Sequence, residues 1–263
     1  MGGADNPDRL DALREAGGPA RVPRPGENRL LAALPRADYQ RLVPQLERVH
    51  LHPGQVLYRP NQPMPHVYFP LSGVISLVTV MAGGGAAEVA TVGSEGMVGL
   101  PVFLGADFAP CEALCQVPGE AWRMPAAAFR EAVQTAATVA PAGRGSPLVA
   151  LLQHYTHALI IEIGQTAACN RLHRITERCA RWLLQAHDRV EGDQFLLTHG
   201  FLAQMLGVRR ATVTTVMGGL QQSGLIRYTR GRVTIVERRR LEAAACECYR
   251  VVKAEFDRLL GPG

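Results

Sequence analysis

The chain has 263 residues, of which 47% are apolar, and its 28 basic and 23 acidic residues give a net charge of +5. This length is sufficient for two domains. No run approaches the about 18 consecutive apolar residues of a membrane helix, and the N-terminus lacks the basic-then-apolar order of a secretory signal. We therefore expect a cytoplasmic protein with no membrane partner. Six cysteines are too few for a disulfide scaffold at this length.

The position of the basic residues is more informative than their number. All but Lys253 are arginine, and this bias, together with 27 Gly and 18 Pro, is typical of a GC-rich genome. Between residues 198 and 240, eight arginines accompany a single acidic residue, so this segment has a net charge of +7 and the rest of the chain −2. One positive segment on a near-neutral body is expected of a nucleic-acid-binding domain, although a solvated charged face would look the same.

The first part of the chain predicts a tail followed by two short helices. Residues 1–27 are rich in Gly, Pro, Asp and Arg and lack apolar periodicity, so we expect a mobile tail. Helical patterns follow over residues 28–34 and from Ala37 to Leu46.

From Val49 to Met124 the pattern changes to short alternating or β-branched runs separated by turn residues. Short strands at such regular spacing indicate an antiparallel sandwich or jelly-roll barrel. No crossover helices intervene, which argues against a parallel α/β fold. The expected strands are 49–52, 56–58, 67–69, 73–80, 89–92, 113–117 and 120–124.

Helical periodicity returns after the barrel. A helix is expected over 125–137, a flexible link over 141–146, and a long helix from Pro147. Because it far exceeds the average of about 11–12 residues, the long helix needs a partner for its apolar stripe. We expect that partner to be the same helix of a second copy, with packing on its own barrel as the alternative. The stripe comprises Leu148, Leu151, Leu152, Tyr155, Leu159, Ile163 and Leu172.

Two further helices are expected near the positive segment. Thr176 is suited to cap a helix that runs through Leu184, and a polar linker follows over 188–193. At the C-terminus a helix is expected over 239–260, and the sequence assigns no role to it or to its Cys246–Cys248 pair.

The most specific pattern lies inside the positive segment. Thr198 is suited to cap a short helix over 201–206, Gly207 and Val208 form a tight turn, and a second helix follows over 209–222. A small residue four positions before the turn glycine is what two helices crossing at about 90–120° require. This arrangement predicts a helix-turn-helix motif.

A basic surface follows from this motif. Residues 225–236 read as two strands about the turn Arg230-Gly231-Arg232, a basic wing. The exposed face near the start of the second helix would read base edges and phosphates in a duplex. The predicted DNA-contacting residues are Thr198, Arg209, Arg210, Thr212, Thr214, Thr215, Arg230 and Arg232.

With these elements in place, the chain resembles the Crp/Fnr family of bacterial transcription regulators. The resemblance implies a homodimer that joins through the long helix, binds a roughly two-fold symmetric duplex DNA operator and contacts RNA polymerase. It implies no catalysis, and no nucleophile or phosphate-loop motif is present. The matching segments are Leu71-Ser72-Gly73, residues 95–99, residues 177–184 and the helix-turn-helix itself.

The sequence departs from the family where its nucleotide-binding members hold cyclic AMP. In those members a Gly-Glu-Leu cassette comes first, and an arginine after it binds the cyclic phosphate. In this chain the position of that arginine falls near Pro110 and Cys111. Losing that arginine leaves the phosphate without a bidentate partner. We therefore expect no cyclic AMP in the usual mode and predict no cofactor, with an unidentified small-molecule effector left open. The candidate effector pocket comprises Gly99, Leu100, Pro101 and Cys111.

The second helix of the motif, the recognition helix over 209–222, also departs from the family pattern. Arg210 matches a DNA-contacting position of the cyclic-AMP receptor, but Ala211 and Thr215 replace its next two contacts, Glu and Arg. The operator is therefore expected to differ from that of the receptor.

Two other function classes remain open at this point. His50 and His52 resemble part of the metal motif of cupin enzymes, but no acid follows within the next eight residues. A thiol-based redox switch through Cys111 is the second alternative. The cysteines lack the N-terminal placement of the family's iron–sulfur sensors, and no motif supports haem at His66 or His154. No metal site is predicted.

The predicted fold is α+β, with an N-terminal antiparallel β jelly roll of the cyclic-nucleotide-binding type, a long dimerisation helix and a C-terminal winged helix-turn-helix. The expected boundaries are 1–27 for the tail, 28–140 for the sensor barrel, 146–187 for the dimerisation helix and hinge, 188–240 for the DNA-binding domain and 241–263 for the C-terminal helix.

Overall fold

The computed structural model describes residues 27–139 and 145–260. The predicted tail therefore lies outside the described residues except for Glu27, and the link over 141–146 is described only at its last two residues.

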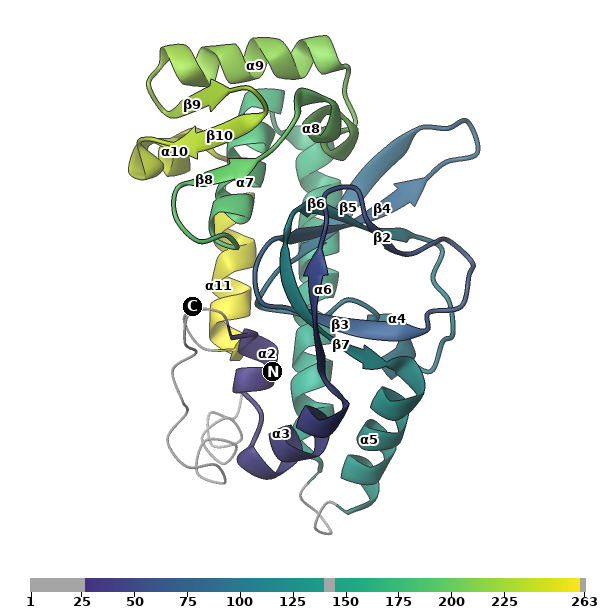
Figure 1. Ribbon diagram of the computed structural model, residues 1–263. Coiled ribbons are helices and arrows are strands. Elements are labelled where there is room, and N and C mark those ends of the chain that lie inside the picture. Colours follow the sequence, from purple (N-terminus) through teal and green to yellow (C-terminus); the bar gives the residue numbers. More distant parts are fainter. Residues whose placement is uncertain (1–26, 140–144, 261–263) are drawn as a thin grey trace, which may run out of the picture.

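A two-sheet antiparallel barrel forms the N-terminal half, as the sequence predicted (Figure 1). One sheet has the strand order β1-β7-β3 and the other β2-β6-β4-β5. All seven expected strands are present, and their inward-facing residues, such as Val67, Ile75 and Ala121, are fully buried. The strands are β1 Glu47–Leu51, β2 Val56–Tyr58, β3 His66–Pro70, β4 Val74–Val80, β5 Ala86–Val92, β6 Glu112–Val117 and β7 Gly119–Pro125.

Short helices close one end of the barrel. Asn28 caps the first of them by accepting a hydrogen bond from the backbone N–H of Leu31 and donating to the carbonyls of Pro70 and Gly96. Helix α4 was not predicted, because its four residues are too few for a periodic signal. The bounds are α2 Arg29–Ala32, α3 Arg36–Leu42, η1 Val43–Gln45, α4 Leu100–Phe103 and α5 Ala126–Thr138.

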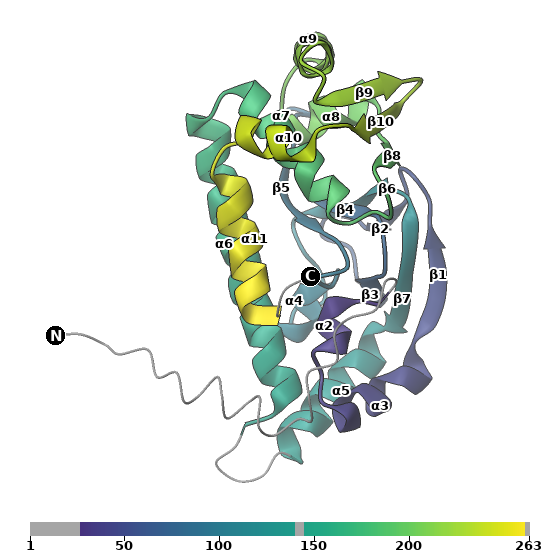
Figure 2. The ribbon, with the colours of Figure 1, turned by 90° about the vertical axis from the view of Figure 1, so that its left-hand side faces the viewer.

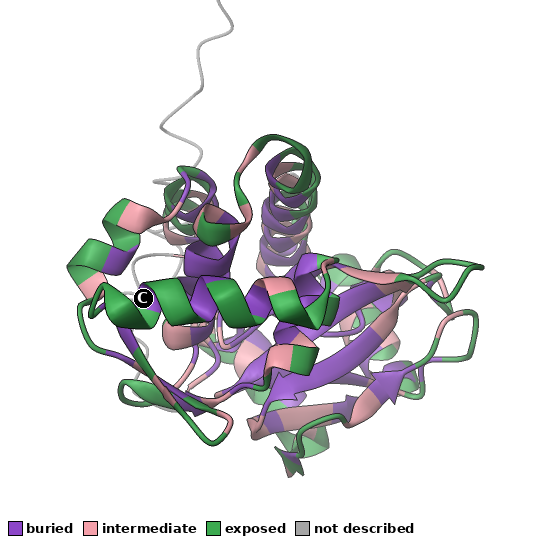
Figure 3. Cartoon of the chain, turned by 90° about the horizontal axis from the view of Figure 1, so that it is seen from above, coloured by how far each residue is buried: buried purple, intermediate pink, exposed green. Residues whose placement is uncertain are grey.

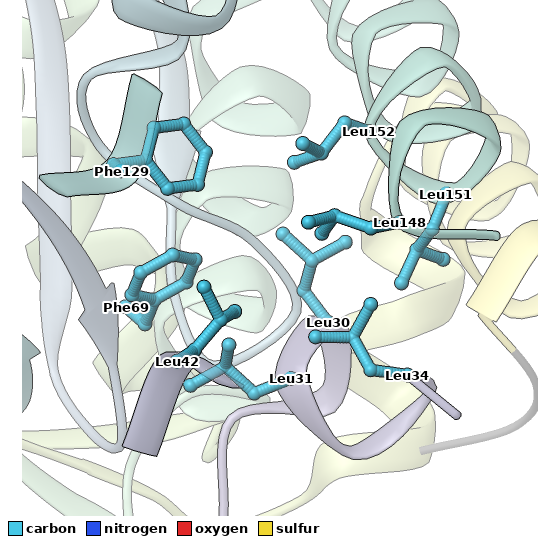
Figure 4. A pocket seen from close by; sticks show the side chains of 9 residues that line it. All are labelled: Leu30, Leu31, Leu34, Leu42, Phe69, Phe129, Leu148, Leu151 and Leu152. Atoms are coloured by element: carbon cyan, nitrogen blue, oxygen red, sulfur yellow. The ribbon is translucent and has the colours of Figure 1, made fainter. Parts of the chain in front are cut away.

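An apolar cavity of about 10 Å³ lies where these helices meet β3 and the long helix (Figure 4). Its lining is leucine and phenylalanine only, including Leu30, Phe69 and Phe129. A space of this size could hold at most one water, and an apolar wall offers that water no partner. The cavity is therefore a packing gap rather than a ligand site.

The long helix α6 spans Pro147–Leu172 and begins at Ser146, whose hydroxyl accepts from the N–H of Val149. Most of its predicted dimer stripe packs on the chain's own barrel, which was the less favoured alternative. Leu148, Leu151, Leu152, Tyr155 and Leu159 belong to the barrel core. By contrast, Ile163 and Leu172 are exposed. A periodic stripe shows that a helix has a partner but does not distinguish an internal partner from a second copy.

Helix α7, Ile175–His187, follows directly and enters the second domain. Its N-cap is Arg174 rather than the predicted Thr176, and the Glu177 carboxylate accepts from the backbone N–H of Arg174 at 2.8 Å. The helix thus starts one residue before Thr176, because Glu177 at its third position satisfies the N-cap backbone.

The second domain is a helix-turn-helix with a three-stranded wing, as predicted apart from one added strand. Strand β8 pairs with β10 and was not predicted from the sequence. The core of this domain includes Trp182, Leu202 and Val213. The elements are β8 Gln194–Leu196, α8 His199–Leu206, α9 Arg210–Gln222, β9 Ile226–Thr229 and β10 Arg232–Ile235.

The predicted single C-terminal helix is in fact two helices, α10 Arg238–Ala244 and α11 Cys248–Leu260. The chain breaks at Ala245, whose backbone is extended at ψ 155°. After the break, α11 packs along α6, and its Phe256 lies against Tyr155 with ring centroids 6.3 Å apart (Figure 2). The sequence prediction was wrong because burial of the α11 apolar face, rather than helix propensity, determines where the chain turns.

The helix-turn-helix domain is docked on the barrel through buried polar contacts. Trp182 on α7 donates its indole N–H to the Glu88 carboxylate on β5 at 3.0 Å. Arg189, just after α7, forms a buried ion pair with Glu95 at 2.6 Å. On α6, Glu162 accepts from the hydroxyl and backbone N–H of Thr91. Three elements far apart in sequence therefore meet beside β5.

Candidate nucleic-acid interface

The α8-turn-α9 geometry follows from local capping. The Thr198 hydroxyl accepts from the N–H of Phe201 at 3.3 Å, which starts α8 as predicted. Gly207 ends α8 at φ 63°, a left-handed conformation that glycine adopts without strain. The N–H of Val208 then donates to the carbonyl of Ala203 at 2.9 Å. These contacts fix the tight turn that brings α9 across α8.

Helix α9 buries one face and exposes the other (Figure 3). Val213, Val216, Met217 and Leu220 pack inward, in agreement with the expected apolar face. The predicted contact residues Arg209, Arg210, Thr214 and Thr215 are exposed, whereas Thr212 is half-buried. With Arg209 as its N-cap, α9 presents both arginines at the helix N-terminus, where backbone N–H groups also favour phosphate.

His199 is a neighbour of this surface that the sequence did not identify. Its Nδ1 lies 2.9 Å from the Thr214 hydroxyl, and its ring stacks on Tyr228 with centroids 4.3 Å apart. Thr214 also donates to the carbonyl of Arg210 at 3.1 Å. Burial and the charge of Arg210 lower the pKa of His199, which keeps the ring neutral beside the arginine. No sequence signal links His199 to Thr214, because only the fold brings together residues 15 positions apart.

The wing adds a second set of cations. Its turn carries Arg230 at φ 49° and Gly231 at φ 78°, so the hairpin reverses tightly between β9 and β10. Arg230 and Arg232 are both exposed. Within the described residues, Arg209, Arg210, Arg230 and Arg232 form no ion pair. Their positive charge is therefore not neutralised by any residue in the described part of the chain.

One arginine of the positive segment has a different use. Arg238 donates to the Asp188 carboxylate, the Glu242 carboxylate and the Tyr249 hydroxyl. These contacts join α10 and α11 to the end of α7. Of the net charge of +7 over residues 198–240, the charge of Arg238 therefore stabilises the fold.

The predicted effector residues lie in the barrel wall but not around a shared cavity that the structure defines. Gly99 begins α4 at φ 101°, and a Cβ there would meet Val67. Leu100 is buried, Pro101 is half-buried, and Cys111 places its Sγ 3.6 Å from the Tyr58 hydroxyl. None of these four lines the apolar gap or the cleft described next.

A cleft of about 230 Å³ lies between α2, the end of α7 and α11. Its charges are largely paired. Arg29 reaches one oxygen of Asp257 across the cleft at 3.0 Å, and Lys253 pairs with the other oxygen along α11 at 3.2 Å. At its floor, Glu95 pairs with Arg189. Glu95 begins the segment 95–99 that resembles the family, and its carboxylate binds the chain's own arginine.

The cupin alternative finds little support in the barrel. His50 is exposed on β1 with Nδ1 3.3 Å from Glu120, and His52 is also exposed, so neither ring faces the barrel interior. A cupin-type metal site requires its histidines inside the barrel.

Comparison with known proteins identifies both domains. Residues 48–136 match the model of the cyclic nucleotide-binding domain, and residues 177–244 match that of the Crp-like helix-turn-helix domain. Together these matches span more than half of the chain. No curated protein matches the sequence as a whole.

Solved structures share the fold at low sequence identity. FixK2 from Bradyrhizobium japonicum has a TM-score of 0.62 at 16% identity, over 76% of this chain and 98% of that one. A Crp/Fnr-family regulator from Eubacterium rectale has a TM-score of 0.60 at 17% identity, over 82% and 96%. The c-di-GMP-responsive regulator CLP from Xanthomonas campestris has a TM-score of 0.58 at 18% identity, over 76% and 98%.

Among the described residues, no helix combines the length and apolar character needed to cross a membrane. The fold is the one that these solved structures share. Since a cyclic nucleotide-binding domain and a Crp-like helix-turn-helix follow one another in a single chain with this fold, the protein belongs to the Crp/Fnr family of transcription regulators.

Proposed function

We propose that the protein acts as a homodimer that reads a roughly two-fold symmetric operator through α9 and its wing. The observation that carries this proposal is the set of exposed, unpaired arginines at the start of α9 and at the wing turn. Cations in this position neutralise phosphates, and the helix N-terminus lies where recognition helices reach base edges. Contact with RNA polymerase is the role that the family suggests for the bound dimer.

Replacing Arg210 by alanine is the direct test of this surface. We expect affinity for the preferred duplex to fall by about 1–3 kcal/mol, because a base-reading arginine is lost while the fold is kept. The duplex is first enriched from a randomised pool with the wild-type protein, and affinity is then measured by fluorescence anisotropy at fixed salt. Arg36→Ala, which removes an exposed arginine from α3, is the matched control. Equal losses for both variants, or no loss for Arg210→Ala, would refute the assignment.

The dimer contact is supported by a second face of α6. Gln153, Thr156, Ile160, Ile163 and Ala167 follow one another at steps of three and four residues and are exposed or half-buried. Ile160 is 62% exposed and Ile163 is 38% exposed. This spacing is the seam of a two-stranded coiled coil. The homodimer therefore uses a face neighbouring the stripe that packs on the barrel.

The double variant Ile160→Glu/Ile163→Glu is expected to be monomeric, since four like charges would meet in the dimer seam. Analytical ultracentrifugation of the full chain measures the mass directly. Val80→Glu is the matched control, because Val80 is 49% exposed at the end of β4, away from α6. A wild-type monomer, or a double variant that remains dimeric, would contradict the proposed seam.

For the sensor barrel we propose that any effector binds without the cyclic-phosphate contact of the nucleotide-binding family members. Cys111 and Pro110 stand where those members place the phosphate-binding arginine, and Glu95 already pairs with Arg189. Isothermal titration calorimetry with cyclic AMP is expected to show no binding at concentrations that saturate a nucleotide-responsive regulator. A measurable affinity that is abolished in Glu95→Gln would overturn this part of the proposal.

A further inference from the structure

Four metal-ligating side chains meet at the junction between the two domains. Cys169 lies in the last turn of α6, and His173 directly follows that helix. Cys246 lies in the short link between α10 and α11, and Cys248 is the first residue of α11. One ligand atom from each of these residues lies within 4.8 Å of every other. The break that the sequence did not predict is therefore what brings the two C-terminal cysteines to α6.

The distances fit one tetrahedral ion. The Sγ atoms of Cys169 and Cys246 are 3.5 Å apart, and the Sγ of Cys248 is 3.5 Å from Nδ1 of His173. With Zn–S of about 2.3 Å and Zn–N of about 2.0–2.1 Å, the edges of a tetrahedron are about 3.8 Å between two sulfurs and about 3.6 Å between sulfur and nitrogen. A disulfide would require about 2.05 Å, and all the cysteines here are free.

The surroundings resemble those of a metal centre. Cys169 and Cys248 are fully buried, Cys246 is 6% exposed, and the three thiols form an apolar cluster of their own. His173 turns its other ring nitrogen, Nε2, to Glu247 Oε1 at 3.2 Å. A carboxylate on the far nitrogen is the usual way a metal-binding histidine is oriented. Gln165 donates its side-chain N–H to Cys248 Sγ at 3.2 Å, as expected for a hydrogen bond to a coordinated thiolate.

Charge balance also fits. Three thiolates, a neutral imidazole and a divalent ion sum to −1, which needs nearby positive charge in a buried place. Arg178 and Arg181 are 9% and 3% exposed, and their charges act on Cys169. The buried Nε atoms of both arginines have no hydrogen-bond partner among the residues that the structure describes. Two buried cations beside the cysteines would offset the negative charge of such a centre.

We propose that Cys169, His173, Cys246 and Cys248 bind one Zn²⁺ ion as a structural site that fastens α11 and the end of α10 to the end of α6. Four protein ligands leave no open coordination position, which is the arrangement of structural rather than catalytic zinc. Because α7 starts two residues after His173, the ion fixes the hinge through which the barrel and the helix-turn-helix domain are joined. This proposal departs from the sequence expectation of no metal site.

The sequence pattern hid this centre for a physical reason. Zinc sites are recognised from two closely spaced ligand pairs such as C-x-x-C. Here the pairs are Cys169-x-x-x-His173 and Cys246-x-Cys248, separated by more than 70 residues that form a complete DNA-binding domain. Only the return of α11 along α6 makes them one site.

The first experiment measures metal in the full chain. Protein purified under reducing conditions is stripped with a chelator and titrated anaerobically with Zn²⁺ alone and with Co²⁺ alone. We expect one ion per chain, and a Co²⁺ spectrum with thiolate charge transfer and the intense visible bands of tetrahedral coordination. Cys246→Ser is expected to weaken Zn²⁺ binding by about 100-fold or more, since an inner ligand counts for at least as much as an outer contact. Cys111→Ser, a thiol in the barrel, is the matched control and is expected to bind one ion as before.

A second variant separates metal binding from folding. Glu247→Gln leaves all four ligands in place, and Glu247 is exposed, so the fold is expected to be kept. Because the ring of His173 then loses its contact with the Glu247 carboxylate, Zn²⁺ binding is expected to weaken by about 10–100-fold, while the Co²⁺ spectrum stays tetrahedral. Circular dichroism of the same samples checks that the fold is unchanged.

Several outcomes would overturn the proposal. The first is that wild-type protein in its reduced form binds neither Zn²⁺ nor Co²⁺. The second is a Cys169–Cys246 disulfide, with no metal, in protein isolated without oxidant. The third is that the purified protein contains iron accompanied by acid-labile sulfide. Equal loss of metal in Cys111→Ser would do the same. None of these measurements involves DNA, so the zinc site and the operator-reading function stand or fall separately.

Discussion

Replacing Arg189 by methionine is expected to lower the free energy of unfolding by about 3–5 kcal/mol, because the change leaves a buried carboxylate without its cation. Arg189 is 8% exposed and Glu95 is 6% exposed. The guanidinium donates to both oxygens of Glu95 at 2.6 to 3.1 Å and to the Thr91 hydroxyl at 2.7 Å. Burial alone would raise the pKa of Glu95, but the charge and hydrogen bonds of Arg189 outweigh it and hold that pKa below its usual value.

The double variant Glu95→Gln/Arg189→Met is the control for this prediction. Removing both charges leaves neither member of the pair without its partner, and such replacements are often close to neutral. We therefore expect urea unfolding to show most of the lost stability restored in the double variant. If the two variants are equally destabilised, packing of Arg189 against Gly93 rather than the ion pair accounts for the loss.

Replacing Glu88 by glutamine is expected to stabilise the protein at pH 8 by about 3 kcal/mol and to change its stability little at pH 5. Burial raises the pKa of Glu88 to about 7, although hydrogen bonds from Ser76 and Trp182 and the charge of Arg181 act in the opposite direction. The nearby carboxylate of Glu162 raises it further. A neutral amide can keep the contact with the Trp182 indole without the cost of a buried charge.

The direction of the pH dependence follows from linkage. Because its folded-state pKa is raised, Glu88 holds a proton in the folded protein between pH 4.5 and about 7 that the unfolded chain has released. The stability that Glu88 contributes through this proton is fully present below pH 4.5 and is lost as the pH rises to about 7. Urea unfolding from pH 5 to pH 8 should therefore show a shallower decline in Glu88→Gln than in wild type.

A residual slope is expected even in Glu88→Gln, since burial also raises the pKa of Glu162. Glu131→Gln, an exposed carboxylate change on α5, serves as the control and should leave the wild-type slope in place. Parallel slopes for wild type and Glu88→Gln would show that Glu88 does not titrate in this range. Since Glu88 contacts Trp182 on α7, such a pH effect acts on the contact between the barrel and the DNA-binding domain.

The sequence predicted local structure well where one pattern determines it. The strand from Val56 to Tyr58, the cap at Thr198 and the apolar face of α9 were confirmed, because alternation, capping chemistry and helical periodicity are local properties. Family membership was predicted for the same reason, since the helix-turn-helix is a continuous segment.

Long-range contacts were not predictable in this way. Glu95 and Arg189 are 94 residues apart, and no local pattern indicated that they form an internal ion pair. The single helix expected over 239–260 was wrong because the break at Ala245 depends on packing against α6. The zinc proposal depends on that break, and the assignment of the α6 dimer face depends on which stripe the barrel covers.

We propose that a dimer of this protein reads a symmetric operator through α9, and selection of binding sites from a pool of randomised duplexes is the sharpest test of that mode of binding. This mode of binding predicts enriched sequences with two inverted half-sites whose centres lie about 34–36 Å apart along the duplex, which is one helical turn. It also predicts that Arg210→Ala relaxes the preference at a defined position in each half-site. A pool that shows no enrichment, or one that yields a single asymmetric site unaffected by Arg210→Ala, would contradict it.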